Sequence, residues 1–461
     1  MINSKNTTPR RGFLKTLGGI TAGMAAIPAI TRASVTAPAR ASGARYMGDF
    51  AAPKLDKVKV AFIGVGARGT GHCRQFAVIE GTEIVGIADL HQDWAERSQN
   101  NAKEHGHDPQ IFYGDENGWR RMLEETKPDA VIISTPWEQH AEQAIGAMEA
   151  GAHAFVELPL GLTIEEMWKI VDTSERTQRH CMLMENVNYG REELLYLNMC
   201  RQGVLGELLH GEAAYIHELR GQMREVERGT GSWRTYHYAK RNGSLYPCHG
   251  LGPVAQYMNL ARGDDNFRRL VSFSSPAPGR NIYARENFPA DHKWNQMEFI
   301  CGDINSALIK THVGRTILVQ WDETSPRPYT RHNMIQGTKG TIKGFPNGMA
   351  IEGMTENFHN WTSSEEFEKI AAEYEHPLWK RVGDLARQMG GHGGMDFLMN
   401  FRIVECLRNG EPLDQNVYEG VYWSAVAPLT EKSVAEDGMP QDFPDFTRGE
   451  WKNTKPLEVV S

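Results

Sequence analysis

Short apolar runs alternate with amphipathic segments through the N-terminal part of the chain. The run from Val58 to Ile63 is rich in β-branched residues and almost unbroken, which is typical of a strand buried on both faces of a parallel sheet. Further runs of this kind are separated by helix-compatible segments and lie at 82–88, 130–136, 152–156 and 181–184. This alternation predicts an α/β domain over residues 55–188, a Rossmann-type doubly wound parallel sheet.

The pattern changes beyond residue 188. Apolar positions at helical spacing predict helices over 191–201 and 395–407. Short strands joined by glycine-containing turns are predicted at 306–313, 316–321, 333–336 and 341–345. Consecutive short strands indicate an α+β domain over 189–430, with a mixed or antiparallel open sheet whose one face packs against the cofactor domain. A C-terminal tail is predicted over 431–461, and its part from 438 to 461, rich in Pro, Asp and Lys, is expected to lie on the surface.

The first 41 residues have the pattern of a targeting segment. The pair Arg10-Arg11 precedes a weakly apolar stretch, 17–30, that contains glycine and proline. This arrangement predicts a twin-arginine signal peptide with processing near Ala33 or Ala41, and no stable membrane span. We therefore expect a periplasmic or secreted protein that crosses the membrane folded, through the twin-arginine export machinery. The alternative is an unstructured N-terminus with a chance arginine pair.

Composition narrows the class of protein. The 461 residues are too many for one core and suit two domains. A net charge of −8 provides no basic field for nucleic acid. The six cysteines form no C-x-x-C pair, so the sequence predicts separate thiols and no metal site. These values are typical of a soluble globular enzyme. They neither require nor exclude a homo-oligomer.

A glycine-rich loop follows the first predicted strand. Gly64, Gly66 and Gly69 form G-x-G-x-x-G, which allows a tight turn, a close approach to a pyrophosphate and a helix N-terminus directed at it. Asp89 ends the second predicted strand, where an acid accepts hydrogen bonds from ribose hydroxyls and disfavours a 2′-phosphate. NAD is therefore predicted over NADP. The alternative is that Asp89 only caps the next helix.

Polar and aromatic side chains follow the third strand at its carboxyl end, where open parallel sheets bind ligands. Trp137, Glu138, Gln139 and His140 occupy this position. We expect Trp137 to pack on the nicotinamide ribose and His140 to reach the cofactor.

Tyrosine and histidine gather between residues 215 and 259. Arg234 precedes the stretch 246–253, Tyr-Pro-Cys-His-Gly-Leu-Gly-Pro. Tyrosine and histidine move protons and arginine holds oxygen atoms, so a catalytic role is predicted for His249. The alternative is a core histidine that caps a helix starting near Pro253.

Three further aromatic residues are suited to stacking on the C–H face of a sugar ring. They are Tyr283, Trp294 and Tyr329. Core packing is the alternative for Tyr283 and Trp294, whereas Tyr329 lies in a predicted loop between strands, where function is commoner.

The two-domain layout resembles the Gfo/Idh/MocA oxidoreductases, which usually carry Glu-Lys-Pro where this chain has Glu157-Leu158-Pro159. Their lysine is commonly catalytic, and Leu158 replaces it. A closer resemblance, over about residues 55–455, is to glycoside hydrolase family 109, known for NAD-dependent α-N-acetylgalactosaminidases. The stretches that carry it are 156–159, 184–189, 246–253, 281–286 and 390–397.

The resemblance implies site residues as well as an activity. The NAD contacts that it implies are Arg68, Gly69, Asp89, Trp137, Glu138, Gln139, His140, Glu157, Leu158 and Asn186. The substrate contacts that it implies are Tyr215, Arg234, Tyr246, Pro247, Cys248, His249 and Tyr329.

The mechanism that the resemblance implies departs from the usual pair of carboxylates. The sugar is transiently oxidised at C3, loses the C2 proton and the C1 leaving group, adds water and is reduced again, with retention. His249 is the expected base for the C3 hydroxyl. Tyr246 or Tyr215 is the candidate C2 base, and either phenol needs a lowered pKa.

Because the cofactor ends the cycle unchanged, a tightly bound and recycled NAD suits an exported enzyme. One alternative is an exported NAD(P)-dependent sugar oxidoreductase. A second is a non-catalytic carbohydrate-binding protein with a relic cofactor fold.

Overall fold

The structure is a computed structural model that describes residues 37–459, and the twin-arginine pair lies outside the described residues. The first sheet is parallel throughout, in the order β3-β2-β1-β4-β5-β6. Its strands are β1 (Val58–Ile63), β2 (Thr82–Asp89), β3 (Gln110–Tyr113), β4 (Ala130–Ile133), β5 (His153–Val156) and β6 (Cys181–Leu183). The predicted doubly wound Rossmann sheet is confirmed, with its switch point between β1 and β4.

Helices follow these strands, as crossover connections in a parallel sheet require. They are α1 (Ala67–Phe76), α2 (Gln92–Lys103), α3 (Gly118–Thr126), α4 (Trp137–Glu149) and α5 (Ile164–Thr177). All four residues of β4 and of β5 are buried, which explains their continuous apolar sequences.

The second sheet has the order β13-β12-β11-β7-β10-β9-β8-β14. Its strands are β7 (Leu208–Ile216), β8 (Phe267–Ser274), β9 (Asn305–Thr311), β10 (Thr316–Asp322), β11 (Met334–Gly337), β12 (Gly340–Lys343), β13 (Gly348–Ile351) and β14 (Gln441–Asp442). β7 and β10 pair in parallel and the other neighbours are antiparallel, so the sheet is mixed.

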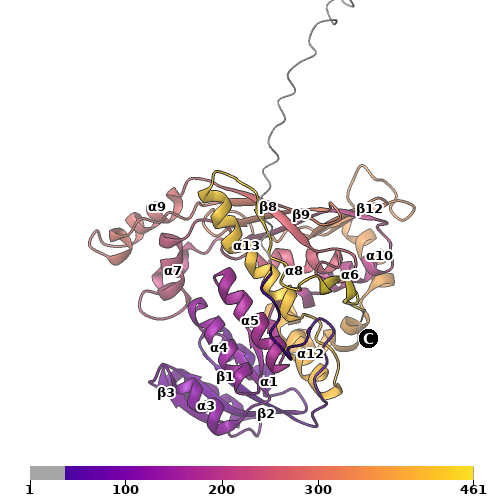
Figure 1. The fold of residues 1–461 in the computed structure, drawn as a ribbon. Coiled ribbons are helices and arrows are strands. Elements are labelled where there is room, and N and C mark those ends of the chain that lie inside the picture. The colour runs from indigo at the N-terminus through magenta and orange to yellow at the C-terminus, as the bar shows by residue number, and fades with distance from the viewer. Residues whose placement is uncertain (1–36, 460–461) are drawn as a thin grey trace, which may run out of the picture. The chain divides into compact units, whose positions relative to one another are not determined.

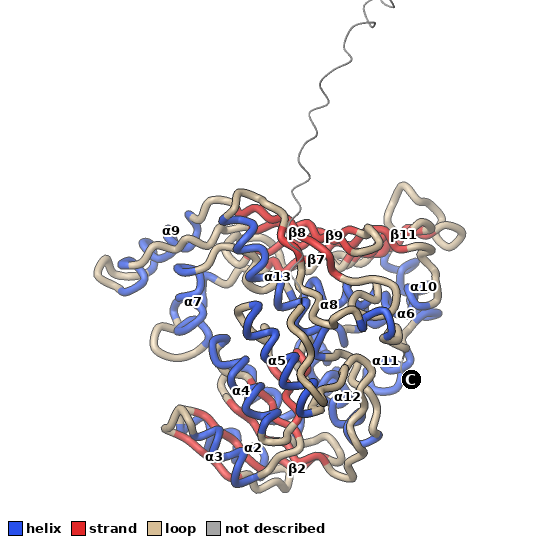
Figure 2. Tube along the Cα trace, in the orientation of Figure 1, coloured by secondary structure: helices blue, strands red, loops and turns tan. Residues whose placement is uncertain are grey.

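One face of this sheet packs on helices. Figure 2 shows its strands beside α13 and α8, and α13 contacts β8 while α8 contacts β7. The helices after β6 are α6 (Arg191–Arg201), α7 (Thr230–Lys240), α8 (Cys248–Tyr257), α9 (Pro278–Asn287), α10 (Ser364–Tyr374), α11 (Pro377–Met389), α12 (Met395–Asn409) and α13 (Val417–Ala435). Short 3-10 helices include η1 (Asn186–Tyr189), η2 (Arg220–Arg224) and η4 (His392–Gly394). Leu308 and Lys310 of β9 are exposed on the other face, at the two-residue spacing of a strand.

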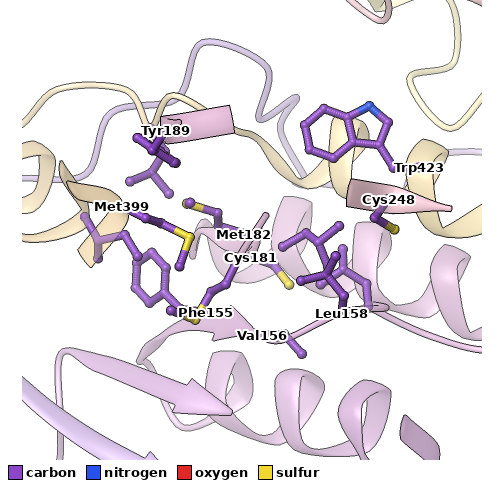
Figure 3. Packing of buried hydrophobic residues seen from close by; sticks show 14 of the residues in the cluster. Phe155, Val156, Leu158, Cys181, Met182, Tyr189, Cys248, Met399 and Trp423 are labelled. Carbon is purple, nitrogen blue, oxygen red and sulfur yellow. The ribbon is translucent and has the colours of Figure 1, made fainter. Parts of the chain in front are cut away.

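The C-terminal helices return to the first sheet. Figure 1 shows α5 beside α13, and α12 contacts α1. Figure 3 shows Met182 of β6, Met399 of α12 and Trp423 of α13 in one buried cluster. The two sheets therefore share core packing, which holds the carboxyl ends of the Rossmann strands close to the second half.

The expectation of a surface tail is wrong. β14 pairs with β8, and Phe443, Phe446 and Trp451 are buried. These apolar residues are separated by polar ones, so the composition of the tail does not indicate that they are buried. Their burial depends on the pairing of β14 with the edge of β8, which is distant in sequence.

The segment that precedes β1 also packs on the fold. Arg40 Nε donates to Glu175 Oε2 at 3.0 Å, and the backbone N–H of Arg45 donates to the Glu175 carbonyl oxygen at 3.0 Å. The Glu175 side chain is fully buried and also accepts from the Tyr418 hydroxyl. Within residues 37–459, no helix is long and apolar enough to cross a membrane.

Candidate active site

A cavity of about 470 Å³ is lined by residues of both halves. The predicted site residues on its wall are Gly64, Gly66, Arg68, Asp89, Trp137, Gln139, His140, Glu157, Leu158, Asn186, Tyr215, Arg234, Tyr246 and His249. The residues predicted to bind cofactor and those predicted to bind substrate therefore line one space at the carboxyl ends of β1, β2, β4 and β5.

The glycine loop forms a backbone cradle at one end of this cavity. Gly64 has φ +81°, and a Cβ on Gly69 would lie 2.0 Å from the Gly64 carbonyl oxygen. Asp89 ties the loop to β2 by accepting from the backbone N–H groups of Val65 and His91, both at 2.8 Å. Burial raises the Asp89 pKa, although these hydrogen bonds oppose the shift. The cradle and the carboxylate fit the pyrophosphate and ribose of a dinucleotide.

Arg68 links the glycine loop to Asp396 of α12, which is distant in sequence. Its Nε donates to Glu157 Oε1 at 2.9 Å, and its Nη1 donates to Asp396 Oδ2 at 3.0 Å. Burial alone would raise the pKa of Glu157, but the charge of Arg68 and a hydrogen bond from His72 lower it to about 2. Asp396 also accepts from His392 Nδ1 at 2.8 Å, and His392 lines the cavity. The carboxylates are thus anionic and hold Arg68 in place.

His249 has a buried carboxylate partner. Its Nδ1 lies 2.7 Å from Oε1 of Glu185, whose side chain is fully buried. A carboxylate that accepts from Nδ1–H leaves Nε2 as the basic nitrogen available to a ligand. The following residue, Gly250, brings α8 against β7, since a Cβ there would lie 2.3 Å from the backbone nitrogen of Ala214. This close packing fixes the ring beside the cavity.

Two phenols stand next to His249. The ring centroids of Tyr215 and Tyr246 lie 5.2 Å and 5.0 Å from that of His249. Burial raises the pKa of both phenols, most strongly through loss of solvation. The lowered pKa that a free phenolate base needs is therefore absent. The Tyr215 hydroxyl lies 3.0 Å from His217 Nδ1, and burial lowers the His217 pKa, so this ring is a neutral acceptor.

Arg234 lies between aromatic rings and a buried acid. Its guanidinium carbon is 4.9 Å from the Trp137 ring and 4.7 Å from the Tyr246 ring. Its Nη2 pairs with Glu323, whose side chain is fully buried, and its Nε donates to the Tyr238 hydroxyl at 2.9 Å. Glu323 therefore fixes the direction of Arg234, which presents its remaining donors to the cavity wall.

Several predicted residues do not line the cavity. Gly69 acts through its backbone, as described above, and Glu138 is half-exposed and pairs with His237 at 3.1 Å. Pro247 precedes α8, and Cys248 is buried in the shared core (Figure 3). Tyr329 is exposed, and its ring lies 6.3 Å from that of Tyr215.

His140 is on the wall but engaged with the backbone. Its ring nitrogens lie 2.6 Å from the Pro159 carbonyl oxygen and 2.8 Å from that of Thr135. Burial lowers its pKa, and the two backbone hydrogen bonds oppose this shift. The two contacts join the segments that follow β4 and β5.

The two other aromatic candidates lie away from the cavity. Trp294 is fully buried, and its indole N–H donates to the Met223 carbonyl oxygen at 2.8 Å. It therefore packs in the core, which was the alternative to stacking on a sugar. Tyr283 packs near Arg220, whose guanidinium carbon is 5.6 Å from its ring. The six cysteines are free thiols, and no cluster of three or more His, Cys, Asp or Glu that could hold a metal occurs in residues 37–459.

Sequence reasoning did not select Glu185, Glu323 or His217 as site residues. His217 had a usable signal, because it follows Tyr215 at the spacing that places side chains on one face of a strand. Glu185 had one as well, because it follows the predicted strand 181–184 at its carboxyl end. Glu323 had none, since it meets Arg234 across a long stretch of chain.

Two family models match consecutive parts of the chain. Residues 58–185 match the family described as "Oxidoreductase family, NAD-binding Rossmann fold", and residues 189–453 match "Glycosyl hydrolase 109, C-terminal domain". The chain belongs to glycosyl hydrolase family 109. It is therefore a glycoside hydrolase with an NAD-binding fold.

Two relatives from this family align over nearly their whole lengths. The chain is 60% identical to glycosyl hydrolase family 109 protein 1 of Akkermansia muciniphila, over 99% of each chain. It is 55% identical to a protein of Shewanella oneidensis named alpha-N-acetylgalactosaminidase, over 98% of each chain.

Solved structures share the fold. Levoglucosan dehydrogenase in complex with NADH and levoglucosan aligns with a TM-score of 0.64 and 18% identity, over 84% of this chain and 99% of that one. Scyllo-inositol dehydrogenase from Lactobacillus casei, with bound NAD(H) and scyllo-inositol, aligns with a TM-score of 0.58 and 14% identity, over 84% and 99%.

Proposed function

We propose that this family 109 protein hydrolyses glycosides that end in α-N-acetylgalactosamine, with retention, by NAD-dependent transient oxidation at C3. The observation that carries the proposal is the His249–Glu185 pair, which lies on the wall of the same cavity as the glycine loop. The name of the Shewanella oneidensis relative supports the choice of sugar.

The cofactor would be held by the cradle of Gly64, Gly66 and Gly69, by Asp89 and by Arg68. When bound, NAD supplies a hydride acceptor for C3 and returns the hydride at the end, without net redox change. Arg68 is already paired with two carboxylates, so it is oriented before any ligand arrives.

His249 takes the proton of the C3 hydroxyl at Nε2. Glu185 holds Nδ1–H and stabilises the imidazolium as it forms, which is the role of the buried acid in a catalytic triad. Arg234, fixed by Glu323, donates to oxygen atoms of the sugar.

The C2 proton becomes acidic once C3 is a carbonyl. Tyr215 takes it in concert with transfer of its own hydroxyl proton to His217 Nδ1, 3.0 Å away. This relay avoids a free phenolate, which burial disfavours. Burial also raises the pKa of Tyr246, so this phenol stays neutral and donates a hydrogen bond to the substrate. Loss of the C1 leaving group, addition of water and re-reduction complete the hydrolysis.

The test is turnover of 4-nitrophenyl α-N-acetylgalactosaminide by purified protein without added NAD, followed by His249→Ala with the NAD content checked. We expect hydrolysis by the wild type and almost none by the variant. Full turnover by a variant that still holds NAD would remove His249 from the mechanism. Hydrolysis in deuterated water should leave deuterium at C2, and its absence would indicate direct displacement.

The second candidate function is an NAD(P)-dependent sugar oxidoreductase. The shared fold favours it. Leu158, however, is a buried apolar side chain at the position where the Gfo/Idh/MocA oxidoreductases that this chain resembles usually carry a lysine. Stoichiometric accumulation of an oxidised sugar would select it over hydrolysis.

Export through the twin-arginine machinery remains part of the proposal, with NAD loaded before the protein crosses the membrane. Of the two expected processing sites, that near Ala33 fits better. Cleavage after Ala41 would remove Arg40 and leave buried Glu175 with one ion-pair partner fewer. The N-terminal sequence of protein recovered from the periplasm tests this choice, and a mature chain that begins at Ser42 would contradict it.

A further inference from the structure

An arginine from the second half of the chain contacts the Rossmann half beside the cavity. Arg228 lies between η2 and α7, and its Nη2 donates to Asp93 Oδ1 at 2.8 Å and Oδ2 at 2.9 Å. Its guanidinium carbon lies 3.7 Å from the centroid of the Trp94 ring. Asp93 and Trp94 are in the first turn of α2, so the contact joins segments that are distant in sequence.

This contact stands at the end of the cavity where the glycine loop and Asp89 lie. Trp94 and Arg228 both line the cavity. A Cβ on Gly66 would come within 3.0 Å of the Trp94 ring, so the indole packs directly on the loop. In a Rossmann fold this region receives the pyrophosphate and the adenosine ribose. The contact therefore flanks the groups expected to hold the adenosine part of NAD.

The segment that carries Arg228 is braced at both ends. The backbone N–H of Gly231 donates to Glu225 Oε2 at 2.8 Å, and Lys293 Nζ donates to the Val226 carbonyl oxygen at 2.8 Å. Arg228 Nε is shielded from solvent and has no hydrogen-bond partner in the described part of the chain, so the contact with Asp93 does not use this donor. The hydrogen bond from Arg228 also lowers the pKa of Asp93, which favours the charged carboxylate in this contact.

We propose that Arg228, Asp93 and Trp94 form a clasp that retains NAD, so that the cofactor leaves only when the ion pair and the ring contact open. The proposal deepens the proposed function, on which it rests for the identity of the cofactor. A clasp of this kind lets one cofactor serve many turnovers. Because the Asp93 side chain is 66% exposed, added salt screens the ion pair and should speed release.

The experiment measures how fast NAD leaves the purified holoenzyme. Protein is diluted into buffer with an excess of a NAD-consuming enzyme, and the NAD that remains bound is quantified over time after rapid gel filtration. We expect Arg228→Ala to release NAD about tenfold faster, from loss of one cation–π contact and one ion pair. Arg228→Lys, which keeps the charge without the planar fork, should be intermediate.

Arg381→Ala is the matched control. Arg381 also makes an ion pair, with Glu405 through both Nη1 and Nη2, and a ring contact of 5.5 Å with Phe401. None of these residues lines the cavity. We expect it to release NAD at the wild-type rate. Raising the salt concentration should speed release from the wild type more than from Arg228→Ala.

Release from Arg228→Ala at the wild-type rate, or equal acceleration by Arg381→Ala, overturns the clasp. So does a wild-type protein whose NAD exchanges within seconds. Failure of the proposed function looks different: NAD is retained and released as expected, but the nitrophenyl glycoside is not hydrolysed. If Arg228→Ala is poorly folded by circular dichroism, Arg228→Lys decides the outcome.

Discussion

Replacing Glu185 with glutamine tests whether a buried carboxylate activates His249. Glu185 Oε1 accepts from His249 Nδ1 at 2.7 Å and from the Val187 backbone N–H at 3.1 Å, whereas Oε2 has no hydrogen-bond partner within residues 37–459. A glutamine can therefore keep its oxygen at the Oε1 position and place its amide group where Oε2 was. The substitution removes the charge and leaves the two accepting contacts.

The expected loss follows from the difference between charged and neutral hydrogen bonds. A hydrogen bond to a charged group contributes about 1.5–3 kcal/mol, against about 0.5–1.5 kcal/mol for a neutral one. A difference of about 1.4 kcal/mol in the transition state lowers kcat about tenfold. KM should hardly change, because the charge of Glu185 matters most when the ring gains its proton.

The assay is steady-state hydrolysis of the nitrophenyl glycoside, with bound NAD quantified in the same preparation. Glu419→Gln is the matched control, since Glu419 is also buried, accepts from Arg262 at 2.7 Å and lies off the cavity wall. It should lower the melting temperature and leave kcat unchanged. A wild-type kcat for Glu185→Gln at full NAD occupancy would refute the reasoning.

Three further outcomes are expected. Glu323→Gln should raise KM about tenfold by weakening the hold on Arg234, measured from initial rates, and an unaltered KM would contradict that role. Gly69→Ala should abolish NAD binding in equilibrium dialysis, because its Cβ would meet a backbone oxygen at 2.0 Å, whereas Gly71→Ala, with nothing within 4 Å, should bind normally. Burial lowers the His153 pKa to about 3, so the folded ring stays neutral while the unfolded chain takes up a proton. For this ring, the free energy of unfolding should fall by about 2 kcal/mol from pH 6.5 to 5, and urea melts of His153→Gln should lack that part.

Local patterns predicted much of the first half. Five of the six Rossmann strands are mostly buried apolar runs, whereas the short edge strand β3 is largely exposed and was not predicted. The glycine loop depends on residues only a few positions apart. Both signals are contained within one element or one turn, where a sequence can be interpreted directly. In the second half, β8 and β14 were not predicted, because their alternating or very short sequences become strands only through pairing with distant partners.

The features of the site also divide into those set by local sequence and those set by tertiary contacts. The sequence by itself determined the residue types, the cradle for a dinucleotide and the presence of His249 beside Tyr246. The tertiary structure alone decided that Glu185 faces His249, that Glu323 holds Arg234 and that Arg228 reaches Trp94. It also reversed the expectation for the phenols, whose pKa values are raised. The physical reason is that pairing and desolvation depend on which distant segments pack together, and spacing along the chain does not contain that information.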